Sequence, residues 1–152
     1  MISARLLATI SGRGAMSIEY EVDHQSRLVR ARGRGTLTDE DVFAYQREVW
    51  SRPEVAGYDE LIDMTEVKEI ALPSGERVRQ LAILSALMDP RSPASKFAIV
   101  APQDLAFGLG RMYQTYRGLD ERSTKKVGVF RTLERALAVL AGEEEADMPR
   151  TK

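Results

Sequence analysis

A serine at the start of a predicted helix is the first candidate for chemistry. Ser74 follows Pro73 and precedes a run of helix-forming residues. Free backbone N–H groups and the helix dipole favour a phosphate at such a position. A phosphoserine would carry about two negative charges and would repel an acidic partner. Serine is also a preferred N-cap residue, and this is the simpler interpretation of Ser74.

Four carboxylates cluster around a strand predicted over residues 58–64. Paired carboxylates act as general acids and bases or bind Mg²⁺. Asp63 falls near the carboxyl end of this strand, where ligands bind in α/β proteins. No second ligand motif accompanies it. We therefore interpret the group as solvated or loop-capping side chains: Asp59, Glu60, Asp63 and Glu66.

Composition excludes several classes of function. The chain has 152 residues, 22 basic and 23 acidic side chains, no cysteine and one histidine, His24. This charge balance predicts no nucleic-acid partner, and no apolar run is long enough to span a membrane. Disulfides, thiol nucleophiles and Cys/His metal sites are excluded. Gly108 and Gly110 do not complete a dinucleotide fingerprint. We assign no catalytic residue, metal or cofactor, and we expect no enzyme.

The elements that must position these residues follow from the spacing of apolar side chains. Alternation over 17–23 and 27–34 predicts an antiparallel hairpin. Helices and strands then alternate, which indicates a mainly parallel sheet. We predict an α/β fold with five strands, an antiparallel N-terminal hairpin strand and four helices. The later elements are expected at 38–50, 58–64, 74–89, 96–101, 103–118, 126–130 and 132–141.

The length fits one domain, which we place at residues 16–142. Residues 1–15 contain an apolar run, LLATI, that is too short for a secretory signal. We interpret this stretch as an N-terminal extension outside the fold, and residues 143–152 as an acidic tail. With no export signal, the expected location is the cytoplasm.

Three stretches carry a family resemblance. LIDMTEVKEIALPSG, between the third strand and the second helix, resembles the STAS domain. AIVAPQDLAFGLGRMYQTY and VGVFRTLERALAVL are similar to the later strands and helices of the SpoIIAA-like (STAS/SEC14) family of small bacterial proteins. The resemblance covers residues 17–141 and implies the same fold.

The resemblance also implies a function and a set of residues. In STAS anti-sigma-factor antagonists, a partner kinase phosphorylates a serine at the second helix, and phosphorylation breaks partner binding. Asp63, Met64 and Thr65 match the first element of that motif, and Ser74 and Gly75 match the end of the second. The regulatory loop would therefore hold Asp63, Thr65, Ser74 and Gly75. The chain departs from the motif at 71–73, which puts the phosphoswitch in doubt.

The second helix is richer in apolar residues than one sheet face requires. LAILSALM, residues 81–88, is apolar nearly all round. Its surplus should pack against a second copy of the chain, so we expect a homodimer. The alternative is a pocket for a small apolar ligand between the second and third helices. Its walls would come from Leu84, Met88, Leu109, Met112 and Tyr116. In the third helix, the apolar side chains Leu105, Leu109, Met112 and Tyr116 are predicted to share one face.

Two functional hypotheses follow. The first is a non-catalytic cytoplasmic module that regulates a protein partner. The second is a carrier or sensor of a small apolar ligand.

Overall fold

The structure is a computed structural model and describes residues 5–12, 15–71, 74–91 and 94–143, with side chains from Ser17 onward. Within these residues one sheet runs in chain order through β1 (Arg5–Gly12), β2 (Ala15–Asp23), β3 (Leu28–Thr38), β4 (Asp59–Ala71), β5 (Ser95–Val100) and β6 (Lys125–Phe130). The helices are α1 (Asp39–Trp50), the 3-10 helix η1 (Pro53–Val55), α2 (Gly75–Met88), α3 (Asp104–Leu119) and α4 (Leu133–Leu140).

The predicted α/β fold is confirmed. Strands β2 and β3 form the antiparallel hairpin, and β3, β4, β5 and β6 pair in parallel. Each parallel connection carries one helix, because parallel neighbours need a crossover. The predicted elements all occur, with ends shifted by a few residues. The main difference is β4, which continues to Ala71 where a polar exit loop was expected.

The sheet has one strand more than the five expected. Residues interpreted as an extension outside the fold contain β1, which pairs antiparallel with β2 from Arg5–Asp23 to Gly12–Ala15. The outer edge of β2 would otherwise present unpaired backbone groups, and β1 satisfies them. The predicted acidic tail lies outside the described residues except for Glu143.

Three polar residues begin helices as the sequence predicts. The Thr38 hydroxyl accepts a hydrogen bond from Asp41 N, and the Asp41 carboxylate accepts one from Thr38 N, which completes a capping box for α1. The hydroxyls of Ser74 and Thr132 cap α2 and α4 in the same way. Pro73, expected to set the start of α2, lies outside the described residues.

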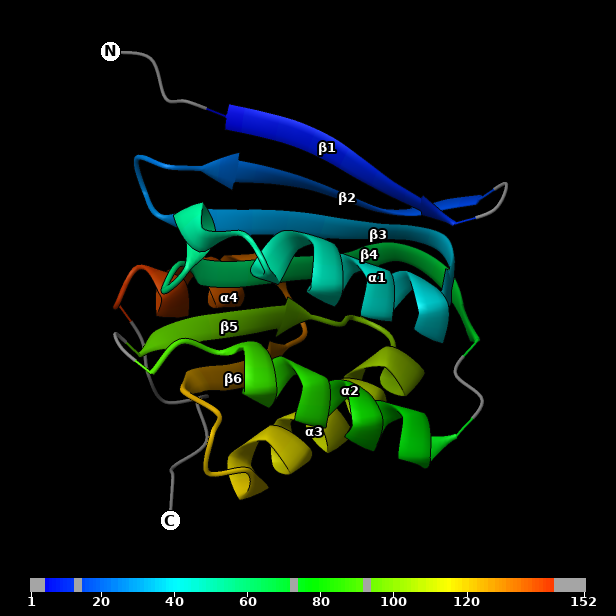
Figure 1. Cartoon of the computed structure of the whole chain (residues 1–152). Coiled ribbons are helices and arrows are strands. Elements are labelled where there is room, and N and C mark those ends of the chain that lie inside the picture. The colour runs from blue at the N-terminus through cyan, green and yellow to red at the C-terminus, as the bar shows by residue number, and fades with distance from the viewer. Residues whose placement is uncertain (1–4, 13–14, 72–73, 92–93, 144–152) are drawn as a thin grey trace.

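The helices cover the two faces of the sheet unequally. Figure 1 shows α1, α2 and α3 on the near face and α4 behind the sheet. The near face packs a continuous apolar core of alternate residues from β2 to β6, including Tyr20, Val29, Ile62, Phe97 and Val127. The far core, under α4, is smaller and is built on Leu61, Ala98, Val100 and Phe130. The broad near face is therefore where a ligand space can form.

Many of the buried residues of helices α2 and α3 are small or polar, whereas some of their large apolar side chains are exposed to solvent. Helix α2 buries Val78, Ala82, Ser85 and Ala86, whereas Leu87 is 57% exposed. Helix α3 buries Ala106, Gly110, Tyr113, Gln114 and Arg117. The predicted apolar stripe of α3 is only partly buried, and Leu105 and Met112 are exposed. Helix α3 turns the side that contains Gly110 towards the sheet, where an added Cβ would lie 3.0 Å from Val129 Cγ1.

Candidate functional site

An apolar cavity of about 100 Å³ lies between the near face of the sheet and helices α1, α2 and α3. Its floor comes from β2 to β5 and its roof from the three helices. Most of the lining side chains are aliphatic or aromatic: Ile18, Leu37, Val42, Phe43, Ile62, Met64, Ile70, Val78, Leu81, Phe97, Ile99 and Leu109. Protein interiors rarely keep voids larger than a water molecule, so this space is the candidate site.

The inner polar residues of the cavity are already satisfied by the protein. The Tyr45 hydroxyl donates to Glu60 Oε2 at 2.8 Å. Gln46 accepts from Ser85 Oγ at 2.9 Å, and Arg117 Nη1 donates to the Tyr113 hydroxyl at 2.5 Å. Burial raises the pKa of both Tyr45 and Tyr113. These groups are held in internal hydrogen bonds, so the deep part of the cavity favours an apolar guest.

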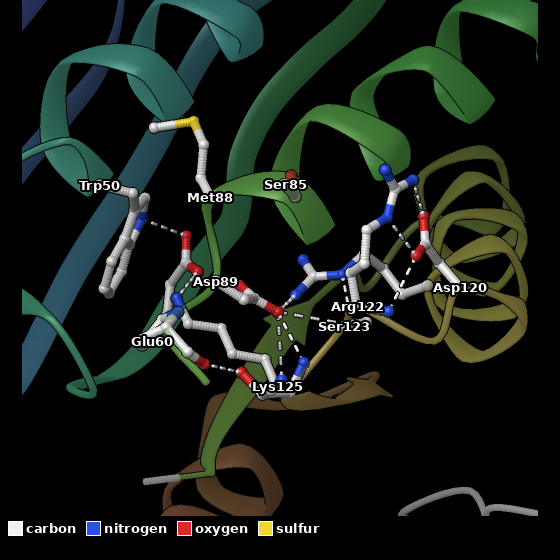
Figure 2. A network of polar contacts seen from close by, with 12 residues as sticks. Trp50, Glu60, Ser85, Met88, Asp89, Asp120, Arg122, Ser123 and Lys125 are labelled. Carbon is white, nitrogen blue, oxygen red and sulfur yellow. Dashed lines mark hydrogen bonds and ion pairs between the residues drawn. The ribbon is translucent and has the colours of Figure 1, made fainter. Parts of the chain in front are cut away.

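Behind the cavity, β4 and β6 share a buried ion pair. Lys125 Nζ lies 2.8 Å from Glu60 Oε1, and both side chains are 3% exposed. Trp50 Nε1 donates to Glu60 Oε2 at 3.1 Å, and Lys125 Nζ lies 3.1 Å from the centre of a Trp50 ring. Figure 2 shows Trp50 and Lys125 on either side of the Glu60 carboxylate. Three donors therefore hold one buried carboxylate in place.

A second buried ion pair connects the end of α2 to α3. Asp89, just after α2 and labelled in Figure 2, pairs with Arg117 of α3. It also accepts a hydrogen bond from Thr124 N at 2.9 Å. Burial lowers the pKa of Arg117, but Tyr113 and Asp89 outweigh it, so the pKa is raised overall. Arg117 therefore stays charged, and the pair fixes α3 against the loop that follows α2.

The other end of the cavity is charged and reaches solvent. Asp39, in the first turn of α1, accepts from Arg77 Nε of α2 at 2.7 Å. The Arg77 guanidinium carbon lies 4.1 Å from the centre of the Phe43 ring, and all three side chains line the cavity. Arg77 is 33% exposed and Asp39 17%. Among the described residues, the polar rim of the cavity is therefore this pair between α1 and α2.

Most of the residues predicted to form an apolar pocket between α2 and α3 lie outside the cavity. Of the five, only Leu109 lines the cavity. Met88 packs against the α1 side of the core and accepts a hydrogen bond from Gln46. Tyr116 packs against the core beneath α3, and Met112 is 36% exposed. The cavity lies between the sheet and the helices, and not between α2 and α3.

The residues of the predicted regulatory loop do not share one loop. Asp63 and Thr65 lie within β4, where Asp63 Oδ1 accepts from Thr65 N at 2.9 Å and from Thr65 Oγ1 at 2.5 Å. Ser74 and Gly75 begin α2. The strand from Thr65 to Ala71 spans about 20 Å at 3.3 Å per residue. Thr65 and Ser74 are both exposed.

The interpretation of the four carboxylates was wrong for one of them. Glu60 is 2% exposed, whereas Glu66 is exposed and Asp59 and Asp63 are intermediate. A signal was present in the sequence. Glu60 lies two residues from Tyr58 and from Ile62 and four from Met64, so the period of two in a strand places all four side chains on the same, core-facing side. The partner of Glu60, Lys125, could not be identified in this way, because it is 65 residues away in the chain and precedes the strand predicted over 126–130.

None of the described residues form a group of three or more His, Cys, Asp or Glu side chains that could hold a metal ion. Burial lowers the pKa of Lys125, against the opposing effect of Glu60, but the ammonium is held in the ion pair. In the same part of the chain, no helix combines the length and apolar character needed to cross a bilayer. The arrangement is suited to holding a small molecule.

Comparison with known proteins yields one fold-level likeness. No protein-family model matches the chain, and no curated protein matches it. A similar solved structure is the 2.25 Å crystal structure of an uncharacterised protein from Shewanella loihica PV-4, of the DUF3478 family, with a SpoIIAA-like fold. The two chains are 16% identical, the match covers 92% of this chain and 96% of the other, and the TM-score is 0.47.

Proposed function

We propose that this protein is a non-catalytic module that binds a small apolar molecule in the cavity beneath α1 and α2. The observation that carries the proposal is the cavity itself, about 100 Å³ with an almost wholly apolar lining. An apolar space of this order accommodates one ring or a chain of about six carbons, since an engineered cavity of about 150 Å³ binds benzene.

The energetics favour an occupant. The apolar walls of the cavity lack the van der Waals partners that a packed core would give them. An apolar guest restores the missing van der Waals contacts without disturbing the hydrogen bonds of Glu60 or Tyr113. A polar guest would find no free partner in the deep part of the cavity.

The test uses benzene as probe and methyl NMR as readout. Titration should shift the methyl signals of Ile62, Ile99 and Leu109, which line the cavity. Val78→Phe fills the space and should abolish the shifts. Met112→Phe is the matched control, because Met112 does not line the cavity and should leave binding unchanged. Unfolding curves check that both variants fold. Absence of shifts in the wild type at saturating benzene would contradict the proposal.

A protein-interaction role is the second candidate, and the outer face of α3 favours it. Leu105, Met112 and Leu119 recur every seven residues, and their side chains are 60%, 36% and 76% exposed. A spacing of seven residues places these three side chains on one side of the helix, as in helices that pair with a partner helix. We propose that a second copy of the chain covers this stripe.

Native mass spectrometry tests the dimer. A dimer is expected for the wild type at micromolar concentration and a monomer for Leu119→Asp. Lys126→Asp is the control, because Lys126 is exposed on β6 rather than on the α3 stripe. A wild-type monomer would contradict this second candidate and leave the ligand proposal unaffected.

A further inference from the structure

The polar groups of the cavity are distributed unevenly, and this distribution bears on the class of ligand. At the deep end, Tyr45, Glu60 and Tyr113 are buried and hydrogen-bonded to other side chains. At the rim, Arg77 and Asp39 are partly exposed. A guest would therefore meet apolar walls along most of its length and charged groups at one end only. That is the environment of a single-headed amphiphile.

Two arginines lie beside Phe43 near the rim, and of the two only Arg77 lines the cavity. Two guanidinium groups flank the Phe43 ring, with Arg77 at 4.1 Å and Arg47 at 5.8 Å from the ring centre. One carboxylate, Asp39, pairs with Arg77. Arg47 has no ion-pair partner among the described residues. The first turn of α2 adds the positive end of its dipole on the same side of the cavity.

Arg77 retains hydrogen-bonding capacity. Its Nε donates to Asp39 Oδ2 at 2.7 Å, and its Nη1 donates to Gln80 Oε1 at 2.6 Å. Within the described part of the chain, Nη2 has no hydrogen-bond partner. A guanidinium fixed on one side by an ion pair and on its face by Phe43 is preorganised, so little side-chain entropy is lost when it binds an anion.

We propose that the cavity binds a monocarboxylate with one short apolar tail, with the tail inside and the carboxylate at Arg77. This inference rests on the proposed function, since it specifies the ligand of the same cavity. The carboxylate accepts from Nη2 of Arg77 and is attracted by the unpaired Arg47. A second head group or a long acyl chain would exceed a cavity of about 100 Å³.

Three probes with the same six-carbon tail separate the head group from the tail. Hexanoate, 1-hexanol and hexylammonium are titrated into the full chain at pH 7, and binding is followed by calorimetry and methyl NMR. Hexanoate should bind about tenfold more tightly than 1-hexanol, since a hydrogen bond to a charged group is stronger than a neutral one. Hexylammonium should bind most weakly.

Variants at the rim assign the effect to a residue. Arg77→Gln should reduce hexanoate affinity to that of 1-hexanol. Arg79→Gln is the matched control, because Arg79 pairs with Glu76 on the same helix and does not line the cavity. Asp39→Asn keeps an amide oxygen that can accept from Arg77 Nε but removes the competing negative charge, so it should strengthen hexanoate binding. This variant gives a second test if Arg77→Gln fails to fold.

The outcomes separate this inference from the proposed function. Equal binding of hexanoate and 1-hexanol, or tightest binding of hexylammonium, would overturn the carboxylate inference and leave the apolar cavity intact. Loss of hexanoate binding in Arg79→Gln but not in Arg77→Gln would also overturn it. If neither these probes nor benzene bind the wild type, both proposals fail.

Discussion

Glu60 of β4 and Lys125 of β6 form an ion pair across the intervening strand β5, with Nζ and Oε1 2.8 Å apart and both side chains buried. Burial lowers the pKa of Lys125, whereas the Glu60 charge and hydrogen bond raise it, and the net direction is downward. The pair thus joins non-adjacent strands directly behind the cavity. Its cost of desolvation is offset by Tyr45 and Trp50, which also donate to Glu60.

Lys125→Met should destabilise the protein strongly. The substitution leaves the Glu60 carboxylate buried without its cation, and breaking such a pair costs about 3–5 kcal/mol. Urea unfolding measures the change. In Glu60→Gln/Lys125→Met the amide oxygen can still accept from Tyr45 and Trp50, so the double variant should be more stable than Lys125→Met alone. A double variant that loses the sum of the single effects would contradict this account.

Asp89→Asn should cost far more than Asp104→Asn. Asp89 is buried with Arg117 and also accepts from Thr124 N, so its loss is expected to cost about 3 kcal/mol or more. Asp104 pairs with Arg131 at the surface, with a 96% exposed side chain, and such pairs contribute about 0–1 kcal/mol. The losses of unfolding free energy relative to the wild type, measured side by side for the two variants, should differ several-fold. Similar values would show that the Asp89 pair is not a structural link.

The two central glycines of α3 should respond oppositely to alanine. Gly108 has open space where a Cβ would lie, so Gly108→Ala should stabilise the helix by about 0.5–1 kcal/mol. At Gly110 the added Cβ would meet Val129 at 3.0 Å and 3.4 Å. Gly110→Ala should therefore show no gain or a loss, because overpacking opposes the helix propensity. Thermal unfolding distinguishes them, and equal gains would refute the close packing of α3 on β6.

Alkaline pH should weaken the fold through the buried tyrosines. The pKa of Tyr45 is raised well above its usual value by burial and by Glu60. A raised pKa gives stability that is fully present below about pH 10, the unfolded value, and is lost as the pH rises towards the folded-state pKa. Tyr45→Phe should therefore show a smaller loss of unfolding free energy above pH 10 than the wild type. Lys125, whose lowered pKa acts in the opposite direction, is present in both proteins. An unchanged alkaline slope would contradict the burial of the phenol.

Two substitutions of Ser74 distinguish a helix-capping role from a regulatory one. Its hydroxyl accepts from Arg77 N at 3.3 Å, so Ser74→Ala should cost about 1 kcal/mol. Ser74→Asp preserves an N-cap acceptor and should keep most of that stability. The regulatory hypothesis adds that Ser74→Asp, but not Ser74→Ala, releases a bound partner, measured by co-purification from the native host. Equal partner retention by both variants would count against a phosphoswitch.

Local sequence patterns predicted most of the architecture. The period-two alternation of residues 17–23 and the caps Thr38, Ser74 and Thr132 depend on neighbours along the chain, and the structure confirms them. The order of strands and helices was predictable for the same reason, since parallel strands need crossovers. These features reflect backbone sterics and amphipathic spacing, which act over a few residues.

The extra strand and the site required the tertiary structure. Residues Arg5–Gly12 become β1 only because β2 offers an edge to pair with. The apolar stripe of α3 suggested the wrong buried face, because helical spacing does not record that Gly110 meets Val129. The cavity is lined by residues from four strands and three helices, and its rim pair joins Asp39 to Arg77, 38 residues apart.

The α/β class, the order of elements and the helix starts could be predicted because they arise from short-range interactions along the chain. Which charges are buried, where the cavity lies and which side chains form its rim could be known only from the folded protein. Those properties depend on residues distant in the chain, such as Glu60 and Lys125, and on the volumes that meet when the layers pack.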